Sequence, residues 1–354
     1  NELRINWRYA AIMRFSISVI EPAGYKYSHF LYDLCKYLCF SIESAGYECC
    51  ILRNKLPHDR MNIIVGAHSQ SDSAIVDKVK QSGHYILLNT EIITGDSINN
   101  WSVQKTFSDV YLPLMRQASA VWTGVQKNIE ALKKLNVEAD QILWGYHPLM
   151  EEIHHKKNKD IDFLFCGSIT PHRKKLLDQL TDRGCKVVTM FDDAAMYRND
   201  LIARSRVNLA PNQGPGMNHL GGGRVLYLIN NHAMVVVERC IDQSRYEHCF
   251  PSADTEQWVD LCMETLHRPD LAQITEEYYE RFKKIPMADL IAPLLENVIR
   301  KIESSRLHVP ATTVTPQTTT ATSNEASRPL LHTGHANAVN GMTSIIILTQ
   351  NRLD

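Results

Sequence analysis

The chain has 354 residues, of which 44% are hydrophobic, so it can bury the cores of about two domains. Its 38 Lys and Arg residues balance 39 Asp and Glu residues, which excludes the strong positive field that recruits nucleic acid or an anionic membrane. Nine cysteines without a C-x-x-C spacing favour reduced thiols and a cytoplasmic protein over disulfides or a zinc site. No apolar run is long enough to predict a transmembrane segment.

The N-terminal half alternates short β-prone runs with amphipathic stretches of helical length, starting at Met13. After a first strand and a helix that ends near Gly46, strands are predicted at 62–68, 85–91, 120–124 and 141–147, with helices between them. Strands separated by helices indicate a parallel sheet covered on both faces. Residues 1–12 precede this pattern as an N-terminal extension and receive no functional role.

A second series of the same kind follows, with strands predicted at 162–168, 186–191, 206–212 and 233–238 and closing helices between Thr255 and Ser304. We therefore predict an α/β protein with two Rossmann-like domains, 13–147 and 148–306, whose parallel sheets face an interdomain cleft. In such folds ligands bind at the carboxyl ends of the strands.

The C-terminal region has a different composition. Residues 307–342 are rich in Thr, Ala, Pro and Ser and predict a linker, because they cannot bury enough apolar surface to fold. Residues 343–354 are β-prone and predict the first strand of a truncated further domain. The alternative is an incidental hydrophobic C-terminus.

Three glycines stand directly before an apolar helix: Gly221, Gly222 and Gly223, followed by Arg224. Backbone N–H groups at a glycine-rich helix start form an anion site, and an arginine there can make a bidentate contact to phosphate. A diphosphate fits this arrangement. The alternative is a flexible loop with a solvated arginine, and the segment is neither G-x-G-x-x-G nor a P-loop.

Several segments carry a family resemblance, among them 160–177 (DIDFLFCGSITPHRKKLL), 197–212 (YRNDLIARSRVNLAPN) and 222–238 (GGRVLYLINNHAMVVVE). Together with 21–29, 62–68, 87–91 and 141–148, they make residues 13–300 resemble bacterial GT-B glycosyltransferases, with a donor domain similar to the CgeB-like group. The resemblance implies transfer of a sugar from a nucleoside diphosphate sugar, held by the second domain, to a carbohydrate or protein acceptor.

The resemblance also implies a donor site without a metal. Its expected members are Gly167, Ser168, Arg173, Asn212, Gly221, Gly222, Gly223, Arg224 and Glu238, with the arginines near phosphate and Glu238 near ribose or sugar hydroxyls. The chain departs from retaining relatives at Asn230, where one acid of an E-x7-E pair is expected. Asp160 and Asp162 form a D-x-D at the start of a strand, away from the expected cleft, and we predict no metal site there.

An inverting transfer needs a base for the acceptor hydroxyl. Glu91, which follows a buried strand at the interdomain edge, is our first candidate, and the alternatives are His29 and His68 because imidazole titrates near neutrality. Each of them also fits a purely structural role. Gly24 and Tyr25 lie in the first strand-to-helix loop and are predicted near the donor phosphate or the acceptor.

Residues 343–354 (TSIIILTQNRLD) resemble the opening strand of GT-A glycosyltransferases, which implies a downstream glycosyltransferase domain in the same polypeptide. Two other functions stay open. A nucleotide-sugar 2-epimerase shares the paired-domain architecture and needs no acceptor. A catalytically degenerate GT-B module would bind nucleotide or glycan without turnover, and Asn230 favours that alternative.

Overall fold

A computed structural model describes residues 13–22, 29–70, 74–94, 97–98, 107–191, 193–214 and 216–307. All of them fall within one compact unit, Asn1–Val309. The N-terminal extension, Gly24, Tyr25, the predicted linker and the predicted strand at 343–354 lie outside the described residues.

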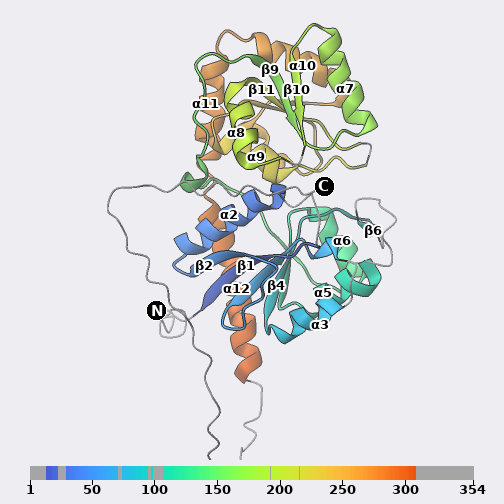
Figure 1. The fold of residues 1–354 in the computed structure, drawn as a ribbon, viewed down its shortest axis with the longest axis vertical. Helices are drawn as coiled ribbons and strands as arrows, with labels where there is room; N and C mark the ends of the chain where they lie inside the picture. Colours follow the sequence, from blue (N-terminus) through green and yellow to red (C-terminus); the bar gives the residue numbers. More distant parts are fainter. Residues whose placement is uncertain are drawn as a thin grey trace, which may run out of the picture. The chain divides into compact units, whose positions relative to one another are not determined.

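Among the described residues, the N-terminal half forms a six-stranded parallel sheet in the order β2-β1-β3-β4-β7-β8 (Figure 1). Its strands are β1 (Arg14–Val19), β2 (Glu48–Arg53), β3 (Met61–Val65), β4 (Tyr85–Asn89), β7 (Ala120–Thr123) and β8 (Asp140–Gln141). The chain leaves β1 toward β2 and then returns to β3 on the other side of β1. Residues that follow β1 and β3 therefore lie at the switch point where α/β folds bind ligands.

Helices cover both faces of this sheet, as the alternation of predicted strands and helices indicates. They are α2 (His29–Ser44), α3 (Ala74–Gln81), α5 (Leu112–Gln117) and α6 (Gln126–Lys134), with a π-helical turn, η2 (Phe107–Tyr111), before α5. Ile63 packs into the cluster with α2, whereas its neighbour Ile64 packs into the cluster with α3 and α5. This alternation is the period-2 pattern of a strand buried on both faces.

In the same described part of the chain, the C-terminal half forms a five-stranded parallel sheet in the order β10-β9-β11-β12-β13. Its strands are β9 (Ile161–Cys166), β10 (Val187–Met190), β11 (Ser205–Ala210), β12 (Val235–Glu238) and β13 (Ser252–Ala253). The helices around it are α7 (Pro171–Asp182), α8 (Ala195–Arg204), α9 (Gly222–Asn230), α10 (Thr255–His267) and α11 (Leu271–Phe282). The two sheets confirm the predicted α/β class.

Within the described residues, the chain passes between the two sheets twice. Of the strand predicted at 141–147, only Gln141 falls within β8, and the segment then runs on toward β9. Tyr146 instead bonds to the returning segment, since its N–H donates to Ile285 O at 2.7 Å and its carbonyl accepts from Met287 N at 2.8 Å. After this point α12 (Met287–Leu307) packs against α2, so the last helix, which we assigned to the second domain, covers the first sheet (Figure 1).

No helix within the described ranges is both long enough and apolar enough to span a bilayer. One large cluster of buried side chains runs from Phe15 on β1 through α2 and α12 to Val225 on α9 and Val235 on β12. The two sheets therefore share a hydrophobic core on this side. Residues of both sheets that form a site would therefore be held in place by this shared core.

Candidate functional site

Arg173 lies in the first turn of α7, at the carboxyl end of β9. Thr170 caps this helix by accepting a hydrogen bond from Arg173 N, and Pro171 occupies the first helical position, where its missing N–H costs nothing. The guanidinium group donates to the carbonyls of Ser168, Pro211 and Asn212 at 3.1 to 3.2 Å. Its Cζ lies 5.3 Å from the centroid of the Phe165 ring.

Arg224 approaches the same ring from the first turn of α9, with its Cζ 5.1 Å from the Phe165 centroid. Gly167, directly after β9, makes this approach possible. A Cβ atom on Gly167 would lie 3.1 Å from Arg224 Nη2 and 2.9 Å from Phe165 Cζ. A larger residue at this position would therefore force the aromatic ring or the guanidinium group to shift.

Positive charge is concentrated at this point. Burial lowers the pKa of Arg173 to about 9, and the nearby Arg224 adds to the lowering while Glu238 opposes it. Burial also lowers the pKa of Arg224. Within the described ranges neither guanidinium group forms an ion pair with a carboxylate, and an arginine keeps its charge at neutral pH. Two partly desolvated cations without a paired carboxylate in the described part of the chain are the arrangement that favours binding of an anion.

The three glycines before Arg224 differ in their surroundings. Gly221 is the N-cap of α9, and a Cβ atom there would meet nothing within 4 Å. Gly222 and Gly223 are already helical, and their Cβ atoms would lie 3.2 Å from Trp144 Cδ1 and 2.9 Å from Leu34 Cδ2. The structure thus gives Gly222 and Gly223 a packing role, because they let α9 approach α2 and the crossover segment.

Glu238, at the end of β12, is buried and already carries three donors. Its carboxylate accepts from Asn212 N at 2.6 Å, from Thr255 Oγ1 at 2.5 Å, and pairs with His172 Nε2 at 2.9 Å. The resemblance implied that Glu238 binds ribose or sugar hydroxyls. In the structure its contacts position the loops after β9 and β11, including Asn212, whose side chain bonds to Arg239 O and Cys240 Sγ; the contact with the sugar stays a prediction.

Asn230, where an acid was expected, lies at the opposite end of α9 from Arg224. Its fully buried amide pairs with the backbone of His147, accepting from His147 N at 3.0 Å and donating to His147 O at 3.1 Å. Asn230 therefore fixes the crossover segment to α9. The amide at this position therefore has a structural role.

A second group of polar side chains follows β3 and β4 of the first sheet. Glu91 comes two residues after the end of β4, and His68 lies in the short 3-10 helix η1 (Ala67–Ser69) after β3. His68 Nε2 lies 3.4 Å from Glu91 Oε1, and both side chains are 12% exposed. The structure therefore brings together two of the three residues that the sequence offered as alternative bases.

The loops that carry this pair are held by local geometry. Gly66 has a φ of 82°, and a Cβ atom on it would lie 2.7 Å from Ile20 O, so only glycine fits before η1. Below Glu91, the Asn89 and Asn128 side chains both donate to Glu91 O, at 2.8 and 2.7 Å. Tyr111 OH donates to Asn89 Oδ1 at 2.9 Å. The Glu91 backbone is thus fixed by a buried polar network.

Some predicted residues lie outside this description. Gly24 and Tyr25 are not among the described residues, and His29 begins α2 but its side chain lies outside the described part of the chain. Asp160, of the D-x-D pattern, pairs with Lys186 and Arg204 at 2.9 and 2.7 Å, and Asp162 accepts from Lys186 N. Sequence reasoning missed Phe165 and His172, although both stand in the quoted segment 160–177.

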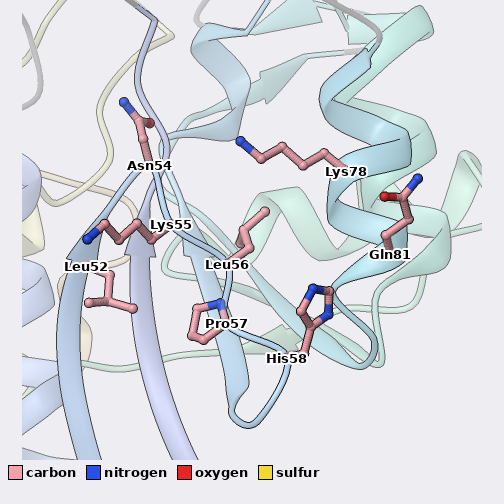
Figure 2. A pocket seen from close by; sticks show the side chains of 8 residues that line it. All are labelled: Leu52, Asn54, Lys55, Leu56, Pro57, His58, Lys78 and Gln81. Carbon is pink, nitrogen blue, oxygen red and sulfur yellow. The ribbon is translucent and has the colours of Figure 1, made fainter. Parts of the chain in front are cut away.

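A separate hollow of about 490 Å³ lies beside the loop after β2 and the end of α3 (Figure 2). The side chains that line it are Leu52, Asn54, Lys55, Leu56, Pro57, His58, Lys78 and Gln81. Its charged and amide groups are exposed, and none of the residues of the two groups above takes part. We therefore do not assign the candidate site to this hollow.

No family model matches the chain, and no curated protein matches it in sequence. Among solved structures it is similar to AviGT4, a glycosyltransferase involved in avilamycin A biosynthesis, with 11% identity, a TM-score of 0.51, and coverage of 82% of this chain and 98% of that one. TarM aligns with 10% identity and a TM-score of 0.48 over 69% of this chain and 55% of its own. The first similarity and the two parallel sheets establish a GT-B fold, in which two Rossmann-like domains are paired.

Proposed function

We propose that the chain is a glycosyltransferase that moves a sugar from a nucleoside diphosphate sugar to a hydroxyl acceptor. The observation that carries this proposal is the pair of guanidinium groups, Arg173 and Arg224, over the Phe165 ring at the carboxyl end of the second sheet. A diphosphate would supply the negative charge that pairs with these two cations. The GT-B fold, which the AviGT4 glycosyltransferase shares, supports the same conclusion.

The two arginines would serve the reaction as well as binding. When the glycosidic bond to the diphosphate breaks, negative charge builds up on the leaving phosphate oxygen, and fixed cations stabilise that charge more than they stabilise the bound donor. Ser168 and Asn212 hold Arg173 in place through their carbonyls, so its orientation is set before the donor binds. We propose that these groups act without a metal ion.

On the first sheet, we propose that Glu91 removes the proton of the acceptor hydroxyl. His68 Nε2 contacts its carboxylate, and Thr90 Oγ1 donates to Glu91 Oε1 at 2.8 Å, so the carboxylate is held in one orientation. A base is needed only if the acceptor displaces the diphosphate directly, with inversion at the sugar carbon. The acceptor class stays a prediction, namely a carbohydrate or a glycosylated polypeptide, and so does the downstream glycosyltransferase domain.

The first test is isothermal titration of the protein with UDP, GDP, UDP-glucose, UDP-N-acetylglucosamine and GDP-mannose. We expect one nucleotide to bind selectively and Arg224→Ala to weaken its affinity by roughly 30-fold or more, since a charged hydrogen-bond partner of the phosphate is lost. Arg268→Ala is the matched control, because Arg268 is an exposed arginine paired with Asp270. Binding that is equally strong in Arg224→Ala would contradict the diphosphate site.

Product analysis with the nucleotide sugar that binds separates the three functions. Release of nucleoside diphosphate that depends on added glycan acceptor supports transfer. Conversion of the nucleotide sugar to its 2-epimer without acceptor would identify an epimerase. Binding that Arg224→Ala abolishes, without turnover on any acceptor, would favour a nucleotide-binding module.

A further inference from the structure

His219 is a buried histidine in the loop between β11 and α9. Its side chain is 3% exposed, and its Nε2 atom has no hydrogen-bond partner among the residues that the structure describes. A buried polar atom of this kind costs folding free energy unless it forms a hydrogen bond with a partner. The loop that carries it ends at Gly221, the N-cap of the helix that presents Arg224.

Asp242 fixes how this imidazole is oriented. One carboxylate oxygen lies 3.3 Å from His219 Nδ1, and the other accepts from Leu220 N at 2.7 Å. A carboxylate is acceptor-only, so the ring nitrogen that faces it carries the proton. In the neutral imidazole, Nε2 is then left with a lone pair and acts as a hydrogen-bond acceptor.

The pair of His219 and Asp242 lies in the neighbourhood of the arginine site. Cys240, which follows β12, feels the charges of both Asp242 and Arg224: burial, Asp242 and Glu238 raise the pKa of its thiol, and Arg224 lowers it. The same thiol bonds to Asn212, whose carbonyl holds Arg173. His219 therefore belongs to the same group of loops, after β11 and β12, as the proposed diphosphate site.

We propose that His219 is a donor-specificity residue whose Nε2 atom accepts a hydrogen bond from a hydroxyl group of the sugar that the nucleoside diphosphate carries. This inference rests on the proposed function and extends it from the diphosphate to the transferred sugar. A phosphate oxygen has no proton to donate and would be repelled by the lone pair of Nε2. A sugar hydroxyl donates, and its loss leaves the buried nitrogen without a partner, which is the condition under which a site discriminates strongly.

The test measures the contribution of the sugar separately from that of the nucleotide. We would determine the affinities of the wild-type protein, His219→Ala, His219→Gln and Asp242→Asn for UDP, UDP-glucose, UDP-N-acetylglucosamine, GDP and GDP-mannose by calorimetry. His219→Ala is expected to lower, by about tenfold, the affinity for the nucleotide sugar that binds best to the wild type. The affinity for the matching nucleoside diphosphate should change by no more than about twofold. His219→Gln, whose amide retains an acceptor, is expected to recover most of the loss.

Two controls make the result decisive. His267→Ala replaces an exposed histidine on α10 and should change neither affinity. Thermal unfolding of each variant without ligand shows whether it folds, and if His219→Ala does not, His219→Gln and Asp242→Asn carry the comparison, with Asp242→Asn expected to weaken only the nucleotide sugar.

The outcomes separate this inference from the proposed function. An equal loss for nucleoside diphosphate and nucleotide sugar, or no loss for either, overturns the role of His219 and leaves the diphosphate site standing. Absence of binding by every nucleotide to the wild-type protein instead overturns the proposed function, and the role of His219 falls with it.

Discussion

The carboxylate of Asp33 on α2 and the guanidinium group of Arg198 on α8 form an ion pair that joins helices of the two sheets. Both side chains are largely buried, at 7% and 15% exposure. Arg198 also lies over the Tyr227 ring, with its Cζ 4.5 Å from the centroid, and Lys36 lies 3.3 Å from the second oxygen of Asp33. Charge pairing therefore adds to the shared hydrophobic core between the two halves.

Breaking this ion pair should destabilise the protein. Arg198→Met leaves a buried carboxylate with Lys36 as its remaining cation, and we expect the free energy of unfolding in urea to fall by about 2 to 3 kcal/mol. A double-mutant cycle with Asp33→Asn isolates the coupling between the two side chains. The exposed pair Arg183 and Asp260 is the control, for which we expect about 0 to 1 kcal/mol. Equal coupling energies in both cycles would contradict the buried bridge.

Gly167→Ala tests whether the stack of Arg224 on Phe165 is needed for diphosphate binding. The added Cβ atom would lie 2.9 Å from the ring and 3.1 Å from the guanidinium group, so one of them must shift. We expect affinity for the nucleoside diphosphate to fall roughly tenfold, because misplaced donors lose much of their effect on a charged ligand. Gly214→Ala adds a methyl group that meets nothing within 4 Å and should bind normally. Calorimetry on both variants decides the matter.

Glu91→Gln tests the proposed base. The amide keeps the shape of the carboxylate and its contact with Thr90, yet it cannot take a proton. We expect the rate of transfer to fall roughly 100-fold or more, while the affinity for the donor nucleotide stays unchanged. Glu130→Gln, on the exposed side of α6, is the control. Transfer at the normal rate in Glu91→Gln would show that another group, or no base at all, serves the acceptor.

Acid should weaken the crossover between the sheets. Burial lowers the pKa of His147 below its usual 6.5, against the opposing effect of the Phe40 carbonyl, and burial also lowers the pKa of His155. The folded protein therefore binds fewer protons than the unfolded chain near these values. The stability that neutral histidines provide is fully present above the unfolded pKa of 6.5 and is lost as the pH falls through the lower folded value.

Thermal unfolding checks this expectation. The midpoint should fall between about pH 7.5 and about pH 5, and the fall should be smaller in His147→Gln, which removes one of the two titrating groups. His84→Gln replaces an exposed histidine directly before β4 and should leave the fall unchanged. The same pH dependence in all three proteins would show that other groups cause it.

Much of the fold follows from local patterns in the sequence. Runs such as Met61–Val65 and Val235–Glu238 are apolar and β-branched, and the helices between them have a clear apolar face, so the α/β class and the parallel sheets are predictable. The stretch at 141–147 is equally apolar. It forms little strand because Trp144 and Tyr146 meet Tyr246 and Ile285, partners more than 100 residues away that no local pattern reveals.

The candidate site is predictable only in part, because local patterns reveal some of its residues and long-range contacts determine the others. Arg173 and Arg224 stand next to turn signals, and their residue type already suggests phosphate, so both could be proposed from the sequence. Their common support, Phe165, reads as an ordinary strand residue until both guanidinium groups are seen above it. His219 gave no signal either, because its partner Asp242 and its unpaired nitrogen are visible only in three dimensions.

The two crossover segments bond to each other at Tyr146, where one segment leaves the first sheet and the other returns to it. A movement that pulls the two halves straight apart would have to break these bonds, whereas a rotation about Tyr146 would keep them. In either movement α12, which packs against α2, would move together with the first sheet. Removing α12 would leave the returning segment without its anchor on the first sheet, so that within the described residues the outgoing crossover would be the one covalent link that still holds the two halves together.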